Sequence, residues 1–542
     1  MNLLHIILKR AGLLGITATI VLGLSACTKN FERYNSDNTG LTDDQLSGDF
    51  NNLSYLKSAQ RSIYNFSGGG DPNSYQVQQN LNADCFSGYF MSPTVFNGGQ
   101  NNLNYFMVTG WNGEAFKVGY LNVMAQVAKL RSTGLETNFP AIWAIAQITQ
   151  VEAMSRVTDI YGPIPYSKAG QSKTDIAYDS QEEIYKRFFL ELDSASNNLR
   201  SFIASGQKIP VDSTKYDAVY GGNLTQWLHF ANSLRLRLAI HILYADAAMA
   251  KEQGQKALDP ANGGVITTNS DNFQLLTSDA GLTNPLVFIS QNWGDIRINA
   301  AIQSYMTGYK DPRISRYMNT STDATVGAVY KGIRIGGVTA SNQKSDYQGY
   351  SQLSTSTFNI NAPVVLMTAA EVYFLRAEAA LNGWSNTGGD AKTLYETGIT
   401  TSMLQWNASS GAYLTDNTSV PAAYTDPKNS ANNLPSPSTI TIQWNDAAST
   451  EEKQERIITQ KWIAMFPEGQ EAWTEFRRTR YPRLFPVKNN LSGGLINTDI
   501  QIRRLPYPQQ EYNTNGAQLQ NGISLLGGAD NGGTRLWWDK KP

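Results

Sequence analysis

Four pairs of helical segments dominate the distribution of apolar residues along this chain. Within each segment apolar side chains recur every three or four positions, which places them on one face of an α-helix. Helices that follow one another in pairs joined by turns build solenoid repeats of the tetratricopeptide kind, although the spacing between pairs is irregular here. The pattern by itself therefore predicts a mostly α fold and is compatible with a helical repeat. The paired segments cover 116–133 with 141–159, 181–199 with 224–245, 368–382 with 389–406, and 450–466 with 468–480.

Polar residues mark the ends of several predicted helices. A Ser or Thr followed three positions later by Glu is a capping box, which begins a helix; this pattern occurs at Ser180 and Glu183, Thr368 and Glu371, and Ser449 and Glu452. Asn223 is placed to begin a further helix, whereas Gly383 and Pro467 are placed to end two others. Three tryptophans on the apolar helix faces are expected to lie in the core, namely Trp227, Trp462 and Trp473.

Long insertions separate the helix pairs, at 66–115, 259–298, 319–366 and 407–448. They are rich in Gly, Asn, Ser, Thr and Pro, and loops of this length in a folded chain are usually either functional or disordered. Short alternations of apolar residues within them predict minor β-hairpins. The C-terminal stretch 487–542 has little helical pattern, and we expect it to wrap over the surface.

The first 27 residues have the pattern of a bacterial lipoprotein signal. Lys9 and Arg10 precede an uncharged apolar run, which is shorter than the roughly 20 residues that span a bilayer. The run ends in Leu-Ser-Ala-Cys, which resembles a lipobox, where a peptidase cuts before the cysteine and lipid is attached to it. We therefore predict a signal peptide at 1–26, a lipidated tether at 27–40 that begins with Cys27, and one helical body at 41–542, anchored to a membrane without spanning it.

The charge of the chain argues against nucleic acid as a partner. The chain has 44 Lys and Arg against 45 Asp and Glu, and loss of the signal peptide removes two basic residues, which leaves 42 against 45, or −3. Binding to a row of phosphates needs a cluster of basic side chains, and the sequence contains none.

The length of the chain is informative as well. Its 542 residues exceed the roughly 250–300 at which a single hydrophobic core stops growing, which fits a repeat body enlarged by insertions.

The sequence has none of the motifs that mark common enzyme classes. It lacks a Gly-rich phosphate loop, a Gly-x-Ser-x-Gly elbow and a His-Glu-x-x-His helix. His229 and His241 lie on one predicted helix about 120° apart around its axis, so they are not expected to share a metal ion. We predict no catalytic residues, no metal site and no cofactor, although the two acids of a glycoside hydrolase would leave no fixed signature.

The segment Arg-Val-Thr-Asp-Ile-Tyr-Gly-Pro-Ile-Pro-Tyr at 156–166 resembles one typical of SusD/RagB-type nutrient-binding lipoproteins. Further similar segments follow in the order of that family, from the lipobox to the last forty residues. They are Tyr-Asp-Ser-Gln-Glu-Glu-Ile-Tyr at 178–185, the stretch 217–238, Asp-Pro-Arg at 311–313, Tyr-Lys-Gly-Ile-Arg at 330–334, the stretch 367–378, and Arg-Arg-Leu-Pro-Tyr-Pro at 503–508.

The resemblance implies an outer-membrane lipoprotein on the cell exterior that covers a SusC-like TonB-dependent barrel. Such a protein would capture an oligosaccharide or other glycan and pass it to the barrel, contributing binding and no catalysis. The resemblance also implies four tetratricopeptide-like helix pairs, with loop insertions that form the ligand face.

Sugars present apolar CH faces surrounded by hydroxyl groups, so their receptors combine flat aromatic rings with amide and charged side chains. Three parts of the insertions carry this mixture, at 89–111, 285–297 and 341–350. A loop tryptophan more often anchors packing than contacts ligand, so we expect only a minority of the candidates to touch the glycan. The candidate glycan-binding residues are Tyr89, Phe96, Asn97, Asn101, Trp111, Trp293, Asp295, Arg297, Tyr347 and Tyr350.

Three other functions stay open at the level of sequence. A lid of the same architecture could bind peptides, as RagB-like members do, although peptide ends call for charged partners that the insertions lack. A surface glycoside hydrolase or lyase would release products from a polysaccharide. A structural scaffold for other lipoproteins would bind its partners and no small ligand.

Overall fold

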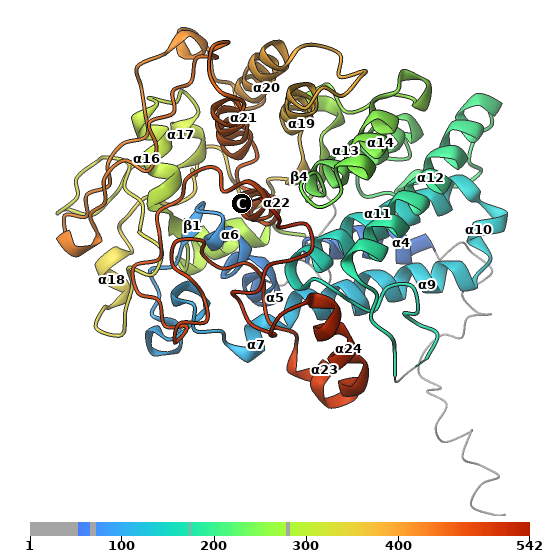
Figure 1. Cartoon of the computed structure of the whole chain (residues 1–542), viewed down its shortest axis with the longest axis horizontal. Helices are drawn as coiled ribbons and strands as arrows, with labels where there is room; N and C mark the ends of the chain where they lie inside the picture. Colours follow the sequence, from blue (N-terminus) through green and yellow to red (C-terminus); the bar gives the residue numbers. More distant parts are fainter. Residues whose placement is uncertain (1–52, 66–71, 173–174, 278–281, 542) are drawn as a thin grey trace, which may run out of the picture. The chain divides into compact units, whose positions relative to one another are not determined.

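Helices form most of the described chain, which in this computed structural model comprises residues 53–65, 72–172, 175–277 and 282–541 (Figure 1). The predicted signal peptide, Cys27 and the tether lie outside these residues. The helices of eight residues or more are α4 (Ser54–Ser62), α9 (Ala125–Ser132), α11 (Pro140–Tyr161), α12 (Gln181–Ser205), α13 (Leu224–His241), α14 (Ala247–Leu258), α16 (Ala300–Gly308), α19 (Ala369–Leu381), α20 (Ala391–Gln405), α21 (Thr450–Ala464), α22 (Gly469–Thr479) and α24 (Gly516–Leu526).

Shorter helices connect these elements. They are α5 (Pro72–Tyr75), α6 (Ala83–Phe86), α7 (Thr109–Asn112), α8 (Glu114–Lys117), α10 (Leu135–Asn138), α15 (Pro285–Phe288), α17 (Ile314–Tyr317), α18 (Lys344–Tyr347) and α23 (Gln509–Thr514), with π-helical turns η4 (Gln76–Asn80), η7 (Val118–Met124) and η11 (Ile289–Trp293).

The predicted helix pairs form and their members are in contact. Helix α11 packs on α9 and η7, α12 on α13, α19 on α20, and α21 on α22. Successive pairs also pack on each other, since α11 lies against α12 and α19 against α21. The mostly helical fold of paired helices is therefore confirmed, and the repeats stack in the way that solenoid repeats do.

Local capping explains where several of these helices begin. Ser449 and Glu452 form a reciprocal capping box at the start of α21, and Asn223 accepts hydrogen bonds from two backbone amides at the start of α13. Thr368 accepts from the amide of Glu371, 3.1 Å away, at the start of α19. These contacts satisfy amides that have no partner within the helix, as the sequence pattern predicts.

Two expectations about the remaining segments are corrected. The C-terminal stretch contains α23 and α24, which the sequence analysis did not predict, and α14 was also missed. Only Ala250, Gly254, Ala257 and Leu258 of α14 are buried, and because three of these four are Ala or Gly, the apolar pattern of the helix is weak. The four strands of the described residues do not form hairpins, because β1 (Phe90–Met91) pairs with β3 (Arg297–Ile298) and β2 (Phe273–Leu275) with β4 (Val364–Met367).

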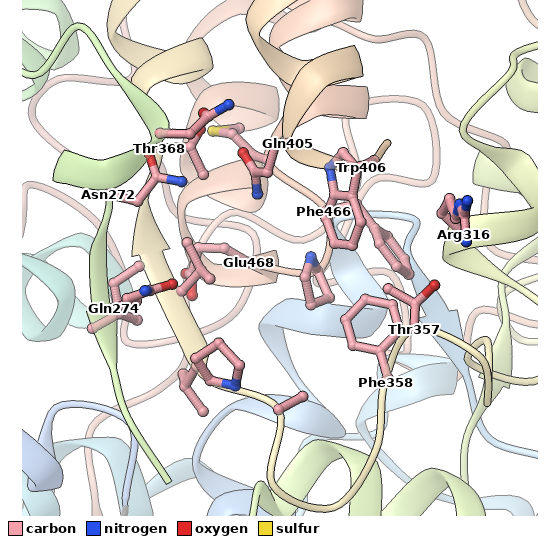
Figure 2. Close-up of a pocket in the computed structure, with 18 of the residues that line it drawn as sticks. Asn272, Gln274, Arg316, Thr357, Phe358, Thr368, Gln405, Trp406, Phe466 and Glu468 are labelled. Atoms are coloured by element: carbon pink, nitrogen blue, oxygen red, sulfur yellow. The ribbon is translucent and has the colours of Figure 1, made fainter. Parts of the chain in front are cut away.

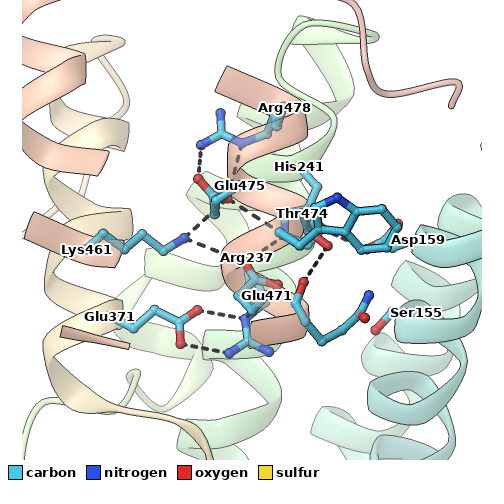
Figure 3. A network of polar contacts seen from close by, with 12 residues as sticks. Ser155, Asp159, Arg237, His241, Glu371, Lys461, Glu471, Thr474, Glu475 and Arg478 are labelled. Carbon is cyan, nitrogen blue, oxygen red and sulfur yellow. Dashed lines mark hydrogen bonds and ion pairs between the residues drawn. The ribbon is translucent and has the colours of Figure 1, made fainter. Parts of the chain in front are cut away.

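A buried network of charged side chains joins the helix pairs (Figure 3). Arg237 of α13 donates to Glu371 of α19, with 2.7 Å between Nε and Oε1, and lies 3.4 Å from Glu152 of α11. Lys461 of α21 lies 3.3 Å from Glu475 of α22. Because each of these ions is buried, its partner is needed to offset the loss of hydration.

His241 of α13 is held in its charged form within this network. Its Nδ1 lies 3.2 Å from Asp159 of α11 and its Nε2 lies 3.0 Å from Glu471 of α22. Burial alone would disfavour the imidazolium, but the charges of Glu471 and Asp159 outweigh burial and raise the pKa of His241 to about 9. His241 and Arg237 in turn lower the pKa of Glu471, against the effect of its own burial.

The apolar faces of these helices pack together to form the hydrophobic core. Trp227, Trp462 and Trp473 are buried as predicted. Residues from Leu53 onward form a single compact unit. No helix in the described ranges combines the length and apolar character needed to cross a bilayer.

Candidate ligand-binding site

The three predicted loops meet on one side of the helical body, where Figure 1 shows β1 and α18. Strand β1, in the first loop, pairs antiparallel with β3, which ends the second loop, so that Met91 lies opposite Arg297. The amide of Ile298 then donates to the carbonyl of Ser351, 2.8 Å away, immediately after the third loop. Segments that are about 200 residues apart in sequence, around Phe90 and Ile298, are thus joined by main-chain hydrogen bonds.

Asp295 links the three loops through its carboxylate. It accepts from the hydroxyl of Thr94 in the first loop and from the ammonium of Lys344 in the third, each at 2.6 Å. Lys344 also donates to the carbonyl of Trp293, 2.9 Å away. The side chains of Lys344 and Asp295 are 33% and 17% exposed, so this ion pair is open to a ligand while it fixes the loops relative to each other.

Close packing between the first and third loops involves Gly99. A Cβ atom at this position would lie 2.6 Å from the amide nitrogen of Ala340, and the backbone has a φ of +79°. This position therefore requires glycine. Any side chain would clash with the backbone of Ala340, and the positive φ would be strained for a residue with a Cβ atom. The loop 89–111 therefore lies directly against the segment that leads into 341–350.

Two half-exposed tryptophans are each held by an aromatic neighbour. Trp111 meets Phe96 edge to face, with 5.6 Å between ring centroids, and Trp293 meets Phe288 in the same way at 5.4 Å. Edge-to-face packing fixes the orientation of each ring, and both side chains remain partly exposed. A fixed, partly exposed ring is what a sugar face needs for stacking.

Several candidate residues are buried and use their polar groups inside the protein. Tyr347 and Tyr350 both donate to the carboxylate of Asp426, at 3.2 and 2.6 Å. Tyr89 donates to the carbonyl of Trp462, and Asn101 caps a short turn by accepting from the amide of Leu103. This burial leaves little surface for a ligand at these four residues.

Arg297 is a structural residue as well. It is 5% exposed and donates to the carbonyls of Gln348 and Ile296, both at 2.7 Å. Burial lowers its pKa to about 10, although Asp295 opposes the shift. The candidates that present surface to solvent are Phe96, Asn97, Trp111, Trp293 and Asp295.

Thr94, Phe288 and Lys344 belong to the same site but were not predicted. Thr94 and Lys344 are contacts of Asp295 across loops, and Phe288 supports Trp293. No local pattern distinguishes these residues from others in the insertions, because their importance depends on a partner in a distant segment.

One group in the described residues has the composition of a metal site. Ligand atoms of His241, Glu471 and Glu475 lie within 4.8 Å of one another. However, Glu475 already accepts from Arg478 at 2.6 Å and faces Lys461 (Figure 3). These cationic side chains balance the carboxylates, so the group serves as part of the ionic network.

Comparisons with known proteins give a consistent result. A family model described as SusD and RagB outer membrane lipoprotein matches residues 33–539. The chain is 43% identical to a chitin-binding SusD homologue from Flavobacterium johnsoniae, over 90% of this chain and 98% of the other, with a TM-score of 0.85. A search among curated proteins found no match.

Two further solved structures show the same similarity. A SusD homologue from Bacteroides vulgatus is 40% identical over 90% of this chain and 97% of its own, with a TM-score of 0.83. One from Bacteroides uniformis is 39% identical over 91% and 100%, with a TM-score of 0.82. The similarity thus covers the helical body and its loop insertions together.

Proposed function

Because the chain belongs to the SusD/RagB family of outer-membrane lipoproteins, we propose that it captures a glycan at the three-loop site and passes it to a SusC-like TonB-dependent barrel. Capture requires binding without bond cleavage, so we propose no catalytic residues. Lipid on Cys27 would hold the protein at the outer membrane, facing the exterior, where a glycan arrives before it is transported.

The observation that carries this proposal is that Trp293, partly exposed and packed on Phe288, lies beside the Asp295–Lys344 ion pair, while the adjoining first loop carries a second partly exposed tryptophan, Trp111, packed on Phe96. Stacking on Trp111 and Trp293 would hold apolar sugar faces, whereas Asn97, Asp295 and Lys344 would bind hydroxyl groups. The site needs no ligand charge, since the carboxylate and the ammonium already neutralise each other. This arrangement favours a neutral oligosaccharide over a charged one.

The similarity to a chitin-binding homologue supports a sugar ligand and suggests where to begin. Chitin carries uncharged N-acetyl groups, which suit a site built from aromatic, amide and balanced charged side chains. We therefore propose that chitin oligosaccharides are the first ligands to be tested.

Isothermal titration of the purified protein against a panel of neutral oligosaccharides, chitin oligosaccharides included, tests the proposal. We expect heat of binding for at least one glycan and markedly weaker binding of that glycan by Trp293→Ala. No response to any glycan, together with binding of peptides, would favour the alternative of a peptide-binding lid.

Incubation with a polysaccharide separates binding from catalysis. We expect the polysaccharide to remain intact, with no shorter products detected by chromatography. Release of oligosaccharides by the purified protein would instead identify a glycoside hydrolase or lyase.

A further inference from the structure

A cavity of about 590 Å³ lies between the β2–β4 sheet and the end of α20 (Figure 2). The loop before β4 and the turn between α21 and α22 complete its walls. Leu286 also lines it, so the cavity shares the segment 285–297 with the three-loop site. Cavities that hold small ligands in proteins are about 300–1,000 Å³ in volume, which makes this one large enough for a small molecule.

Arg316 of α17 is the charged side chain that a ligand in this cavity can reach. It lines the cavity and is half-buried, and no hydrogen bond or ion pair of its side chain is found among the described residues. The other charged residues of the lining, Glu371 and Glu468, are 1% and 4% exposed. Glu371 accepts from Arg237 at 2.7 Å. Glu468 accepts from Arg156 at 3.0 Å. Because both carboxylates are paired behind the wall, the cavity presents one positive charge without a direct partner.

An aromatic ring lies on the same side of the cavity as Arg316. Figure 2 shows Trp406 there, and this residue is half-buried. Trp406 meets Tyr317, the residue after Arg316, edge to face with 4.9 Å between ring centroids. It also packs on Phe358 at 5.6 Å. These contacts fix the orientation of the indole ring and tie it to the helix that carries Arg316.

Gln274 of β2 lies across the cavity from Trp406 (Figure 2). It is half-buried, and its side-chain amide makes no hydrogen bond to other parts of the chain that the structure describes. A carboxamide both donates and accepts, so it is able to bind hydroxyl groups. The groups within reach of a ligand thus include a cation, an aromatic ring and an amide.

Each of these groups fits a different part of an acidic sugar. A guanidinium binds a carboxylate through two parallel hydrogen bonds, an indole ring offers a surface for the apolar CH face, and an amide binds hydroxyl groups. A phosphate ester carries about 1.5–2 negative charges, which exceeds the single positive charge of Arg316. We propose that this cavity binds a sugar unit with one carboxylate group, as in a uronic acid.

The cavity and the three-loop site therefore suit sugars of different charge. At the loops Lys344 is paired with Asp295, whereas Arg316 has no acidic partner within the described ranges. The proposal goes beyond glycan capture at the loops and does not rest on it, because it concerns a single sugar unit bound beside Trp406.

Two matched pairs of monosaccharides test the proposal, namely glucuronate with glucose and galacturonate with galactose. The members of each pair differ only at C6, where the acid has a carboxylate. Each sugar is added alone to the purified, ¹⁵N-labelled protein, and the indole N–H resonance of Trp406 is followed by NMR. The chain has 11 tryptophans, and Trp406→Phe identifies the resonance by its disappearance. We expect at least one acid to shift it in a saturable manner and to bind about tenfold or more tightly than its neutral partner.

Matched variants then test the role of the charge. Arg316→Gln removes the guanidinium and should weaken the acidic sugar by about tenfold or more. Lys540→Gln removes the same charge from an exposed residue that does not line the cavity, and it should leave binding unchanged. Unshifted resonances of the other tryptophans confirm that the variants are folded. A Trp406 resonance that neither acid moves, equal binding of acidic and neutral sugars, or full binding by Arg316→Gln would each overturn the proposal.

Discussion

At the scale of single residues, an aromatic side chain in the insertions is buried where its polar group has a hydrogen-bond partner inside the protein. Tyr350 and Trp293 both lie in insertions with similar sequences, yet Tyr350 is buried against Asp426 and Trp293 remains half-exposed. Asp426 is 76 positions from Tyr350. The sequence could therefore predict which loops carry aromatic residues but not which of those residues face solvent.

Replacement of either site tryptophan tests this distinction. We expect Trp293→Ala and Trp111→Ala to weaken glycan binding by about tenfold or more, because each removes a fixed ring for stacking. The melting temperature should change little, since both side chains are half-exposed. Tyr512→Ala, which removes a 39% exposed aromatic ring on α23, is the control and should bind as the wild type does. Unfolding of both tryptophan variants would mean that these residues belong to the core.

Gly254 permits helix α14 to pack closely. A Cβ atom there would lie 1.9–2.8 Å from ring atoms of Trp384. Ala is favoured over Gly within a helix by about 1 kcal/mol, but overpacking costs about 1–3 kcal/mol. We therefore expect Gly254→Ala to lower the free energy of unfolding in a denaturant titration. Gly516→Ala, in α24 with no atom within 4 Å, is the control and should be neutral or stabilising; equal behaviour of the two variants would argue against the tight contact.

At the scale of elements, local signals predicted the helices well, because capping and apolar periodicity act within one or two turns. The starts of α13, α19 and α21 follow directly from Asn223, Thr368 and Ser449. The short strands could not be predicted, since β1 and β3 are two residues long and are stabilised by each other across a long stretch of sequence. Helix α14 was missed because few of its residues are apolar and large.

The ionic network between helices predicts a dependence of stability on pH. The pKa of His241 rises from its ordinary value of about 6.5 in the unfolded chain to about 9 in the folded protein. Its stabilising contribution is therefore complete below pH 6.5 and is lost as the pH rises through 9, by up to about 3 kcal/mol. We expect the melting temperature to fall over this range.

His241→Gln isolates this effect. The variant should be less stable than the wild type at pH 6.5 and should lose this part of the pH dependence, because glutamine has no charge to lose. Differential scanning calorimetry of both proteins between pH 6.5 and 9 measures the difference. Parallel curves for the two proteins would contradict the assignment of the charge to His241.

At the scale of the whole molecule, the helix pairs and the insertions between them form one compact unit. The sequence predicted the division into these two parts, because helix pairs and Gly-rich insertions differ in composition. It could not predict that 89–111, 285–297 and 341–350 meet, since that depends on Asp295 binding Thr94 and Lys344 across distant loops. The site is thus a property of the complete fold.

Membrane attachment belongs to this scale as well. We expect Cys27→Ser to release the protein from the membrane fraction, because the substitution removes the thiol to which we propose that lipid is attached. Fractionation of cells that express each form measures the distribution. Continued membrane attachment of the variant would show that lipid on Cys27 is not the anchor.

The central claim is that a glycan binds where the three loops meet. A crystal structure of the protein with the oligosaccharide that gives the strongest titration response tests it most directly. We predict sugar rings stacked on Trp293 or Trp111, with hydroxyl groups within hydrogen-bond distance of Asp295 or Lys344. An oligosaccharide bound elsewhere, with no contact to either tryptophan, would contradict the claim.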